Sequence, residues 1–382
     1  MPVPETGEPE MSPRAKPFAE YLVIGAGFAG AATAYHLARA GAQGVQLLEQ
    51  EPVAGMHSSG RNAAFLRQVI ADPSVATLAA QGTAFIQRLP SDWPVTVAYN
   101  AIGSLLLARG PQWAELCKDA ENARVAGLPV ECWSADQTRQ ALPLVEQGNF
   151  EGAIWCPSDG VVDIHALLSG YLKAAQERGV VIRYRTPVRD IAVSGERIVG
   201  VHTDNGLIRA GTVINAAGPW AGPIGTMAGA LPIHFHPCRR HLFVTPPLSW
   251  VDANWPFVLN VSDGVYFRPE SGGLMLCPCD EDEVPPGDAS TNGAVMELLA
   301  EKFRIAYPNF PDVPIARHWA GLRTFTDDGR FVIGWDPGVK GFFWVSGLAG
   351  HGVTTSAAVG ALAAATLLGD QEQEAFSPSR FL

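Results

Sequence analysis

The stretch Tyr21-Leu22-Val23-Ile24-Gly25-Ala26-Gly27-Phe28-Ala29-Gly30 decides the fold. An apolar run typical of a buried β-strand ends at Gly25, and a G-x-G-x-x-G pattern then leads into a helical stretch over residues 31–40. Gly25 permits a tight turn out of the strand, Gly27 lets the backbone approach a pyrophosphate, and Gly30 lets the helix pack closely on the strand. Because the N-terminus of such a helix presents free N–H groups and a positive dipole end, the pattern predicts a dinucleotide site.

The next apolar run, residues 45–48, ends in Glu49 and Gln50. An acid about 20 residues beyond the glycines, at the end of the second strand, can accept a hydrogen bond from a ribose hydroxyl. Its carboxylate favours a free ribose over a 2′-phosphate, but it does not separate NAD from FAD. The alternative is a glycine-rich turn without a ligand, which the combination of strand, glycines, helix, second strand and acid disfavours.

Length and composition bound the class of protein. A chain of 382 residues is too long for one small core, so we expect two domains. With 47% hydrophobic and 17% charged residues it is globular, and its net charge of −11 argues against nucleic acid or an anionic membrane as main partner. No apolar run reaches the ~18 residues of a membrane span. Residues 1–17 lack the apolar core of a signal peptide, so we predict a disordered leader and a cytoplasmic protein.

The cysteines do not indicate a metal site. The chain contains six of them in scattered positions, and none forms a C-x-x-C pair. We therefore predict no metal and mostly buried, free thiols. The cysteines are Cys117, Cys132, Cys156, Cys238, Cys277 and Cys279.

Three further segments are rich in glycine and small residues. The loop His57-Ser58-Ser59-Gly60-Arg61-Asn62-Ala63-Ala64 precedes an expected helix, and it is either a second anion- or flavin-facing loop or an ordinary helix cap with a surface arginine. A buried strand ends in Asn215-Ala216-Ala217-Gly218-Pro219-Trp220, where small residues leave room for a ligand. The last strand runs into Leu348-Ala349-Gly350-His351-Gly352, and a helix over residues 353–368 follows.

These pieces, taken in order, resemble a known family. They continue with Val188 after Thr186-Pro187, with Arg239-Arg240, and with Ala320-Gly321-Leu322-Arg323. The chain is similar to the D-amino-acid oxidase/glycine oxidase/sarcosine oxidase family of FAD enzymes, and most resembles the bacterial FAD-dependent D-amino-acid dehydrogenases of the D-arginine type. The matching pieces run from Tyr21 to the C-terminus, so the resemblance covers nearly the whole chain.

The resemblance implies an α/β protein with two domains. A Rossmann-like FAD domain would be built from residues 18–92, 158–229 and 320–382, and an α+β substrate domain with an antiparallel sheet from residues 93–157 and 230–319. FAD would be bound non-covalently. The residues that the resemblance places against FAD are Gly25, Gly27, Phe28, Ala29, Gly30, Glu49, Gln50, His57, Ser58, Ser59, Arg61, Asn62, Ala63, Val188, Ala217, Gly218, Trp220, Gly321, Arg323, Gly350, Gly352, Val353 and Thr354.

The implied reaction moves a hydride from Cα of an amino acid to the flavin, and the resulting imine hydrolyses to a 2-oxo acid. Arg240 and Arg323 would hold the substrate carboxylate with Tyr266, while Gly350 and His351 would lie at the pyrimidine edge of the flavin. Taken alone, Arg240 could equally be a surface charge and Tyr266 a core residue.

The chain also departs from the D-arginine type. Where that type has a histidine, a hydroxyl and a tyrosine, this chain has Phe65, Arg67 and Ile70 in the helix expected after the loop. Ser104 replaces an acid that meets a cationic side chain, and Thr354 replaces an amide. A buried cation would lack its partner, so basic substrates are disfavoured. We predict a substrate pocket lined by Phe65, Ile70 and Ser104 that accepts small or apolar amino acids.

Other interpretations keep the FAD motifs. The substrate is alternatively glycine, sarcosine, proline or another secondary amine. A 2-hydroxy acid would need a base, for which His351 or His57 are the candidates. His57 could also carry a covalently bound flavin. A non-enzymatic FAD protein is a further alternative, but such a protein would have lost the clamp arginines Arg240 and Arg323, which are both present here. Oxygen or a quinone or dye remains open as electron acceptor.

Overall fold

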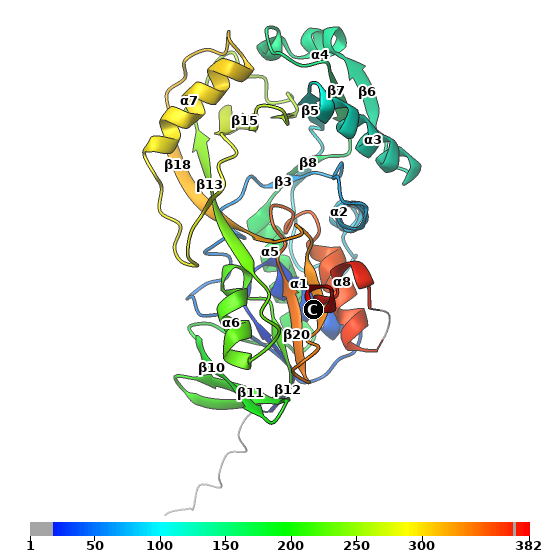
Figure 1. The fold of residues 1–382 in the computed structure, drawn as a ribbon, viewed down its shortest axis with the longest axis vertical. Coiled ribbons are helices and arrows are strands. Elements are labelled where there is room, and N and C mark those ends of the chain that lie inside the picture. Colours follow the sequence, from blue (N-terminus) through cyan, green and yellow to red (C-terminus); the bar gives the residue numbers. More distant parts are fainter. Residues whose placement is uncertain (1–17, 370–371) are drawn as a thin grey trace, which may run out of the picture.

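The computed structural model describes residues 18–369 and 372–382, so the expected leader, residues 1–17, lies outside the described part of the chain. The described residues form two large β-sheets, one toward each end of the molecule, and a small third sheet between them (Figure 1). The first sheet is mostly parallel and the second mostly antiparallel, which confirms the predicted α/β class.

The first sheet grows from the quoted N-terminal stretch. Its strand order is β10-β11-β12-β1-β2-β9, with β20 on β12 and β19 on β20. The neighbours of β1 and β2 run parallel, whereas β10, β11 and β12 form an antiparallel meander. The strands are β1 (Phe18–Ile24), β2 (Val45–Leu48), β9 (Val181–Arg183), β10 (Val188–Ser194), β11 (Arg197–Thr203), β12 (Gly206–Asn215), β19 (Val332–Trp335) and β20 (Phe342–Ser346).

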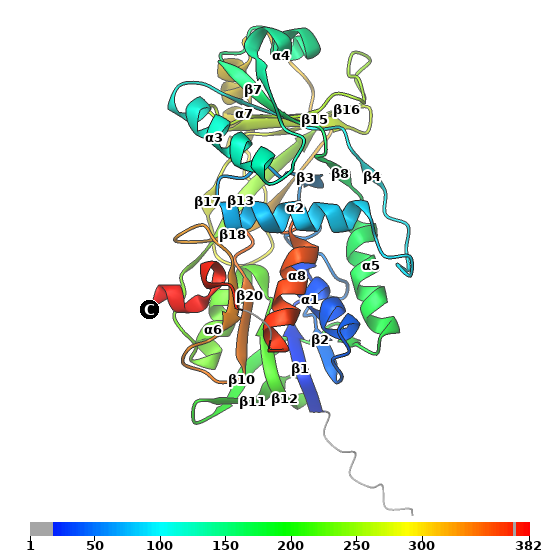
Figure 2. The ribbon, with the colours of Figure 1, turned by 90° about the vertical axis from the view of Figure 1, so that its right-hand side faces the viewer.

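Helices cover both faces of this sheet. Because successive side chains of a strand point to opposite faces, Val23 packs in one core cluster and Leu22 and Ile24 pack in the other. The first cluster lies under α1 (Phe28–Arg39), α5 (Ile164–Glu177) and α8 (Ser356–Leu367), which lie side by side in Figure 2. The second cluster lies under α6 (Ala221–Ala228). The long helix α2 (Pro73–Gln87) lies across the end of α8.

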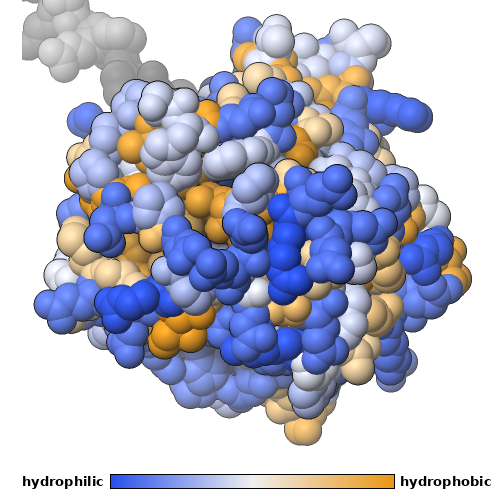
Figure 3. All heavy atoms as spheres, turned by 90° about the horizontal axis from the view of Figure 1, so that it is seen from above, coloured by the Kyte–Doolittle hydropathy of each residue, from blue (hydrophilic) through white to orange (hydrophobic). Residues whose placement is uncertain are grey.

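The second sheet has the order β17-β13-β16-β15-β14-β5-β7-β6, and β18 pairs with β13. Helices cover both of its faces around β5 and β7: α3 (Pro111–Val125) packs on the face of Leu106 and Ile154, whereas α4 (Ala135–Ala141) and α7 (Ala294–Ala306) pack on the face of Leu105 and Leu107. The end of the molecule that carries α4 and α7 presents a mostly hydrophilic surface with small separate hydrophobic areas (Figure 3). The strands are β5 (Ser104–Ala108), β6 (Glu131–Ser134), β7 (Gly152–Cys156), β13 (Phe235–Val244), β14 (Phe257–Asn260), β15 (Val265–Glu270), β16 (Gly273–Cys277), β17 (Asp282–Glu283) and β18 (Arg317–Thr326).

The two large sheets draw on different parts of the chain. The first takes strands from residues 18–48, 181–215 and 332–346, and the second from residues 104–156 and 235–326. The domain boundary expected after residue 319 falls inside β18, which pairs with β13 over its whole length and therefore belongs to the second sheet throughout. The rest of the expected division stays a prediction.

The small third sheet corrects one expectation. It consists of β3 (Phe65–Leu66), β8 (Gly160–Val162) and β4 (Tyr99–Asn100). The helix expected directly after the loop at residues 57–64 is wrong, because Ala64 has φ +54° and Phe65 pairs with Val161 of β8. Short alanine-rich runs favour a helix locally, but here the pairing with a distant strand decides the conformation.

None of the helices in residues 18–369 and 372–382 combines the length and the apolar character that a membrane span requires.

Gly30 gives a test of the packing of α1 on β1. A Cβ at Gly30 would lie 1.9 Å from the carbonyl oxygen of Gly25. We therefore expect Gly30→Ala to lower the free energy of unfolding by about 3 kcal/mol or more and to weaken FAD retention. Gly222→Ala is the matched control, because its Cβ would meet nothing closer than 3.8 Å and alanine favours the helix. Urea unfolding of both variants measures the difference, and equal stabilities would contradict this account of the packing.

His36 makes stability depend on pH. Burial, and then the charge of Arg39, lowers the pKa of His36 to about 4. The unfolded chain binds a proton at His36 near pH 6.5 and the folded chain only near pH 4, so stability is lost as pH falls through this window. The loss is up to about 1.4 kcal/mol per pH unit. In His36→Leu we expect a slope that is shallower by this amount in urea unfolding between pH 7 and pH 5. An unchanged slope would count against this assignment.

Candidate functional site

Two adjoining cavities open where β1, β12 and β20 end. The larger has a volume of about 360 Å³ and the smaller about 170 Å³. They lie next to each other, because both are lined by Gly27, Ser58, Ser59, Ala216 and Gly218. An α/β sheet typically binds its ligand at the carboxyl ends of neighbouring strands whose connections leave toward opposite faces of the sheet.

The glycine turn lies where the two cavities meet. Gly25 has φ +102°, a conformation that glycine adopts without strain. A Cβ at Gly27 would lie 2.9 Å from Ser59 Oγ, which accepts a hydrogen bond from the N–H of Phe28. Gly30 lines neither cavity, and its contact with Gly25 shows that it serves helix packing.

The smaller cavity is organised by Glu49. One carboxylate oxygen of this buried residue accepts from the N–H of Ala26 at 2.8 Å, and the other from the N–H of Glu51 at 2.9 Å. His57 Nε2 lies 2.9 Å from Glu51, and its ring makes an edge contact with Trp220. The residues expected at the cofactor that line this cavity are Gly25, Gly27, Glu49, Gln50, His57, Ser58, Ser59, Val188, Ala217, Gly218 and Trp220.

The larger cavity brings together the other expected residues. These residues come from six separate segments of the chain, while Ile70 and Ser104 do not line it. The expected residues that do line it and not the smaller cavity are Phe28, Ala29, Arg61, Asn62, Ala63, Phe65, Arg240, Tyr266, Gly321, Arg323, Gly350, His351, Gly352, Val353 and Thr354.

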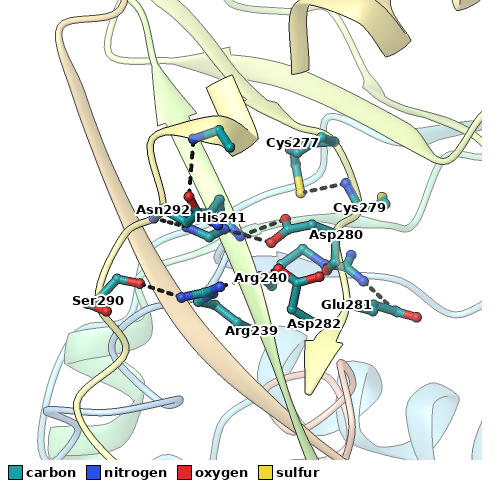
Figure 4. A network of polar contacts seen from close by, with 12 residues as sticks. Arg239, Arg240, His241, Cys277, Cys279, Asp280, Glu281, Asp282, Ser290 and Asn292 are labelled. Carbon is teal, nitrogen blue, oxygen red and sulfur yellow. Dashed lines mark hydrogen bonds and ion pairs between the residues drawn. The ribbon is translucent and has the colours of Figure 1, made fainter. Parts of the chain in front are cut away.

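Arg240 and Arg323 reach this cavity from the paired strands β13 and β18. The buried Arg240 donates to the carbonyl of Asp280 at 2.6 Å and forms an ion pair with Glu281 (Figure 4). Arg323 has no ion pair or side-chain hydrogen bond within the described ranges of the chain. The two expected clamp residues therefore differ, because only Arg323 has all its donors available.

Tyr266 faces the same cavity from β15. Its side chain is 4% exposed, and burial raises the pKa of its hydroxyl well above the usual value. In the part of the chain that the structure describes, this hydroxyl has no nitrogen or oxygen partner. A buried hydroxyl without such a partner is costly, so the group is available to a ligand in the cavity.

His351 is neutral at pH 7. Burial, and then the charges of Arg67 and Arg323, lowers its pKa to about 3. Gly350 allows a close approach here, because a Cβ at this position would lie 3.1 Å from Arg323 Nη1. His351 is consequently a weak base in this environment.

An acidic segment, residues 279–292, closes one side of the larger cavity, and Cys279 and Glu281 line that cavity. His241 fastens both ends of the segment (Figure 4). Its Nε2 accepts from the N–H of Asn292 at 2.9 Å, so Nδ1 carries the proton and donates to Asp280 at 2.6 Å. Arg61 holds the middle through an ion pair of 2.5 Å with Asp288.

Ser104 and Ile70 correct the predicted pocket. Ser104 is fully buried and donates to Asp159 Oδ2 at 2.7 Å. Gln68 donates to Asp159 Oδ1 from both its backbone at 3.1 Å and its side chain at 3.0 Å, and burial raises the pKa of Asp159 to about 6. Ile70 packs against the core beneath α1. Both residues thus stabilise the region around the cavity without facing it.

Arg67 lines the cavity, although it was not among the site residues predicted from the sequence. It is half-buried and lines the larger cavity just after β3, and its N–H donates to Thr354 Oγ1 at 3.4 Å. The available signal was a charged residue within the otherwise mostly apolar run at residues 65–70. Such a charge needs a partner or a function.

One group of possible metal ligands lies outside the cavities. His234, His236 and Asp327 place three ligand atoms within 4.8 Å of one another near the surface. None of them lines the site, and the absence of a metal from the chemistry stays a prediction.

Comparisons with known proteins agree with this geometry. The chain is 26% identical over 358 residues to pyruvate dehydrogenase phosphatase regulatory subunit, mitochondrial, of Mus musculus, covering 90% of this chain and 40% of that protein. It is 26% identical over 384 residues to dimethylglycine dehydrogenase, mitochondrial, of Rattus norvegicus, covering 92% and 43%. The chain thus spans about two fifths of the length of these relatives.

The fold has solved counterparts. The crystal structure of L-proline dehydrogenase from P. horikoshii superimposes with a TM-score of 0.85 at 23% identity, over 96% of this chain and 98% of that one. The family described as DAO, FAD dependent oxidoreductase, matches residues 20–366. The chain therefore belongs to the DAO family of FAD dependent oxidoreductases, and FAD is its cofactor.

Proposed function

We propose that the protein oxidises the carbon–nitrogen bond of an amine that carries a carboxylate. The observation that carries this proposal is that one cavity is lined by two groups available to a ligand: within the described residues, the guanidinium of Arg323 has no ion pair and the hydroxyl of Tyr266 has no nitrogen or oxygen partner. An arginine binds a carboxylate through two parallel hydrogen bonds, and a phenol adds a third.

The residues of both cavities fit FAD. The adenosine end would lie in the smaller cavity near Glu49 and Val188, and the pyrophosphate against the glycine turn. This placement is supported by the start of α1: its N-cap, Gly27, provides no side-chain cap and its first turn holds no acid, so the turn suits an anion although Ser59 accepts from the N–H of Phe28. His57 lines the smaller cavity, away from Tyr266 and Arg323, which favours a non-covalent cofactor.

When bound, FAD supplies the two-electron oxidant that accepts a hydride from the substrate. The residues of this chain would orient the carbon that loses the hydride, with Arg323 and Tyr266 fixing the carboxylate. The stacked rings of Phe65 and Phe257, 4.2 Å apart, form an apolar wall that excludes water. A neutral His351 would leave the positive charge of the site to the arginines.

An amine substrate suits this site better than a 2-hydroxy acid. The lone pair of a neutral amine assists hydride loss directly, whereas a hydroxyl needs a base to take its proton. His351 has its pKa lowered to about 3, and His57 lines only the other cavity, so neither supports a hydroxy acid.

Two kinds of amine fit the proposal. A primary amino acid, of D configuration or with a small apolar side chain, follows from the sequence resemblance. A secondary or tertiary amine is supported by the relatives named dimethylglycine dehydrogenase and L-proline dehydrogenase. Flavin reduction without oxygen by D-, L- and N-methyl amino acids separates the two. Oxygen or a quinone as acceptor, and a cytoplasmic location, belong to the proposal as well.

Acid precipitation tests the mode of cofactor binding. We expect all of the yellow colour to enter the supernatant as free FAD, because His57 faces the smaller cavity and bonds to Glu51. His57→Gln is the control and should release its colour in the same way. Colour that stays with the wild-type pellet and leaves it in His57→Gln would establish a covalent link instead.

Replacing the arginines tests the clamp. We expect Arg323→Met to raise KM by an amount equivalent to about 2–5 kcal/mol of lost binding. Arg240→Met should raise it less, because Arg240 is already paired with Glu281. Arg88→Met removes an exposed arginine at the end of α2 and should leave KM unchanged. A normal KM in Arg323→Met would place the carboxylate elsewhere.

A further inference from the structure

The larger cavity contains more positive charge than one carboxylate can neutralise. The charged side chains that line it are Arg61, Arg67, Arg240, Arg323 and Glu281. Arg61 is paired with Asp288, and Arg240 is paired with Glu281. This leaves Arg67 and Arg323, neither of which has an ion pair in residues 18–369 and 372–382.

A backbone hydrogen bond fixes the position of Arg67, whereas the N–H donors of its side chain remain available to a ligand. Its N–H donates to the buried Thr354, which anchors the residue at the start of the last helical segment. Burial lowers the pKa of Arg67, and Asp159 acts in the opposite direction. Even so, the hydrogen bonds that Asp159 accepts come from Gln68 and Ser104, not from Arg67. The guanidinium stays charged, and its five N–H donors have no hydrogen-bond partner among the residues that the structure describes.

Arg67 and Arg323 also act on each other. Each charge opposes the other, and both contribute to the low pKa of His351. Two like charges in a partly desolvated cavity are unfavourable until anions neutralise them. One substrate carboxylate on Arg323 and Tyr266 leaves the second cation unmatched.

We propose that Arg67 forms a second anion subsite, and that the preferred substrate is an amine with two carboxylates. This inference rests on the proposed function and names its substrate class. Acidic amino acids and N-carboxyalkyl amino acids share this chemistry, since both place a second carboxylate a few bonds from the amine. The assignment replaces the neutral side chain predicted from sequence, which assumed that Ile70 and Ser104 face the substrate.

Matched substrate pairs test the class. We expect aspartate or glutamate to outrank alanine, or iminodiacetate to outrank sarcosine, by about 10-fold or more in kcat/KM for flavin reduction. The first pair, run with D- and L-forms, reports on acidic amino acids, and the second on N-carboxyalkyl amines. Arg67→Met should cost the dicarboxylates about 100-fold and the monocarboxylates only a few-fold, with Arg67→Lys in between. Arg88→Met is the control for loss of an arginine elsewhere.

A binding measurement provides a readout that does not depend on turnover. The oxidised holoenzyme is titrated with acetate, malonate and succinate, and the perturbation of flavin absorbance gives each Kd. We expect the dicarboxylates to bind about 10-fold or more tighter than acetate in the wild type, and this preference to disappear in Arg67→Met.

The outcomes separate the two proposals. If no amine reduces the flavin but dicarboxylates still bind in an Arg67-dependent way, the proposed function fails and the anion subsite stands. If amines reduce the flavin and Arg67→Met leaves the ratio of dicarboxylate to monocarboxylate unchanged, the subsite is overturned. A shift of the flavin midpoint potential in Arg67→Met with an unchanged ratio would assign Arg67 to the flavin, which also overturns it.

Discussion

The antiparallel pairing of β13 with β18 is the interaction on which the site depends. It runs without a break from Phe235 opposite Thr326 to Val244 opposite Arg317, and it extends between the two large sheets (Figure 1). This register sets Arg240 opposite Gly321, where a Cβ would lie 2.3 Å from the carbonyl oxygen of Arg61. A slip of one residue would turn the arginines to the other face, so the pairing fixes the position of the positive charge as well as the fold.

Much of the fold was predictable because its signals are local. The strand, glycine turn and helix at residues 18–39 are encoded within a few turns of chain, and Val45–Leu48 was predicted with its observed bounds. The smaller cavity was predictable for the same reason, since Glu49 follows directly after such a strand. The helix predicted at Phe65 was wrong, because pairing with a strand about 95 residues further along the chain determines the conformation of this segment.

The substrate end of the site was less predictable, because its charged side chains form ion pairs with residues that are far away in the sequence. Ser104 was predicted to line the substrate pocket, but its hydroxyl donates a hydrogen bond to Asp159, which lies 55 residues further along the chain. Glu281 and Asp288, in the acidic segment at residues 279–292, neutralise arginines of the cavity. Sequence alone could identify these charges but not assign them to one another, and Arg67 stands out only after the pairing is known.

The fastening of the acidic segment has a consequence for how molecules enter. Residues 280 and 292 are bonded to the fully buried His241 and residues 282–283 pair with β13, whereas Asp288, whose side chain is 76% exposed, is held by its ion pair with Arg61. Exposed ion pairs are screened by dissolved salt, while the buried contacts of His241 are not. We therefore expect the stretch around Asp288 to loosen as ionic strength rises and small molecules to enter the larger cavity faster, while residues 280–283 and 292 stay in place.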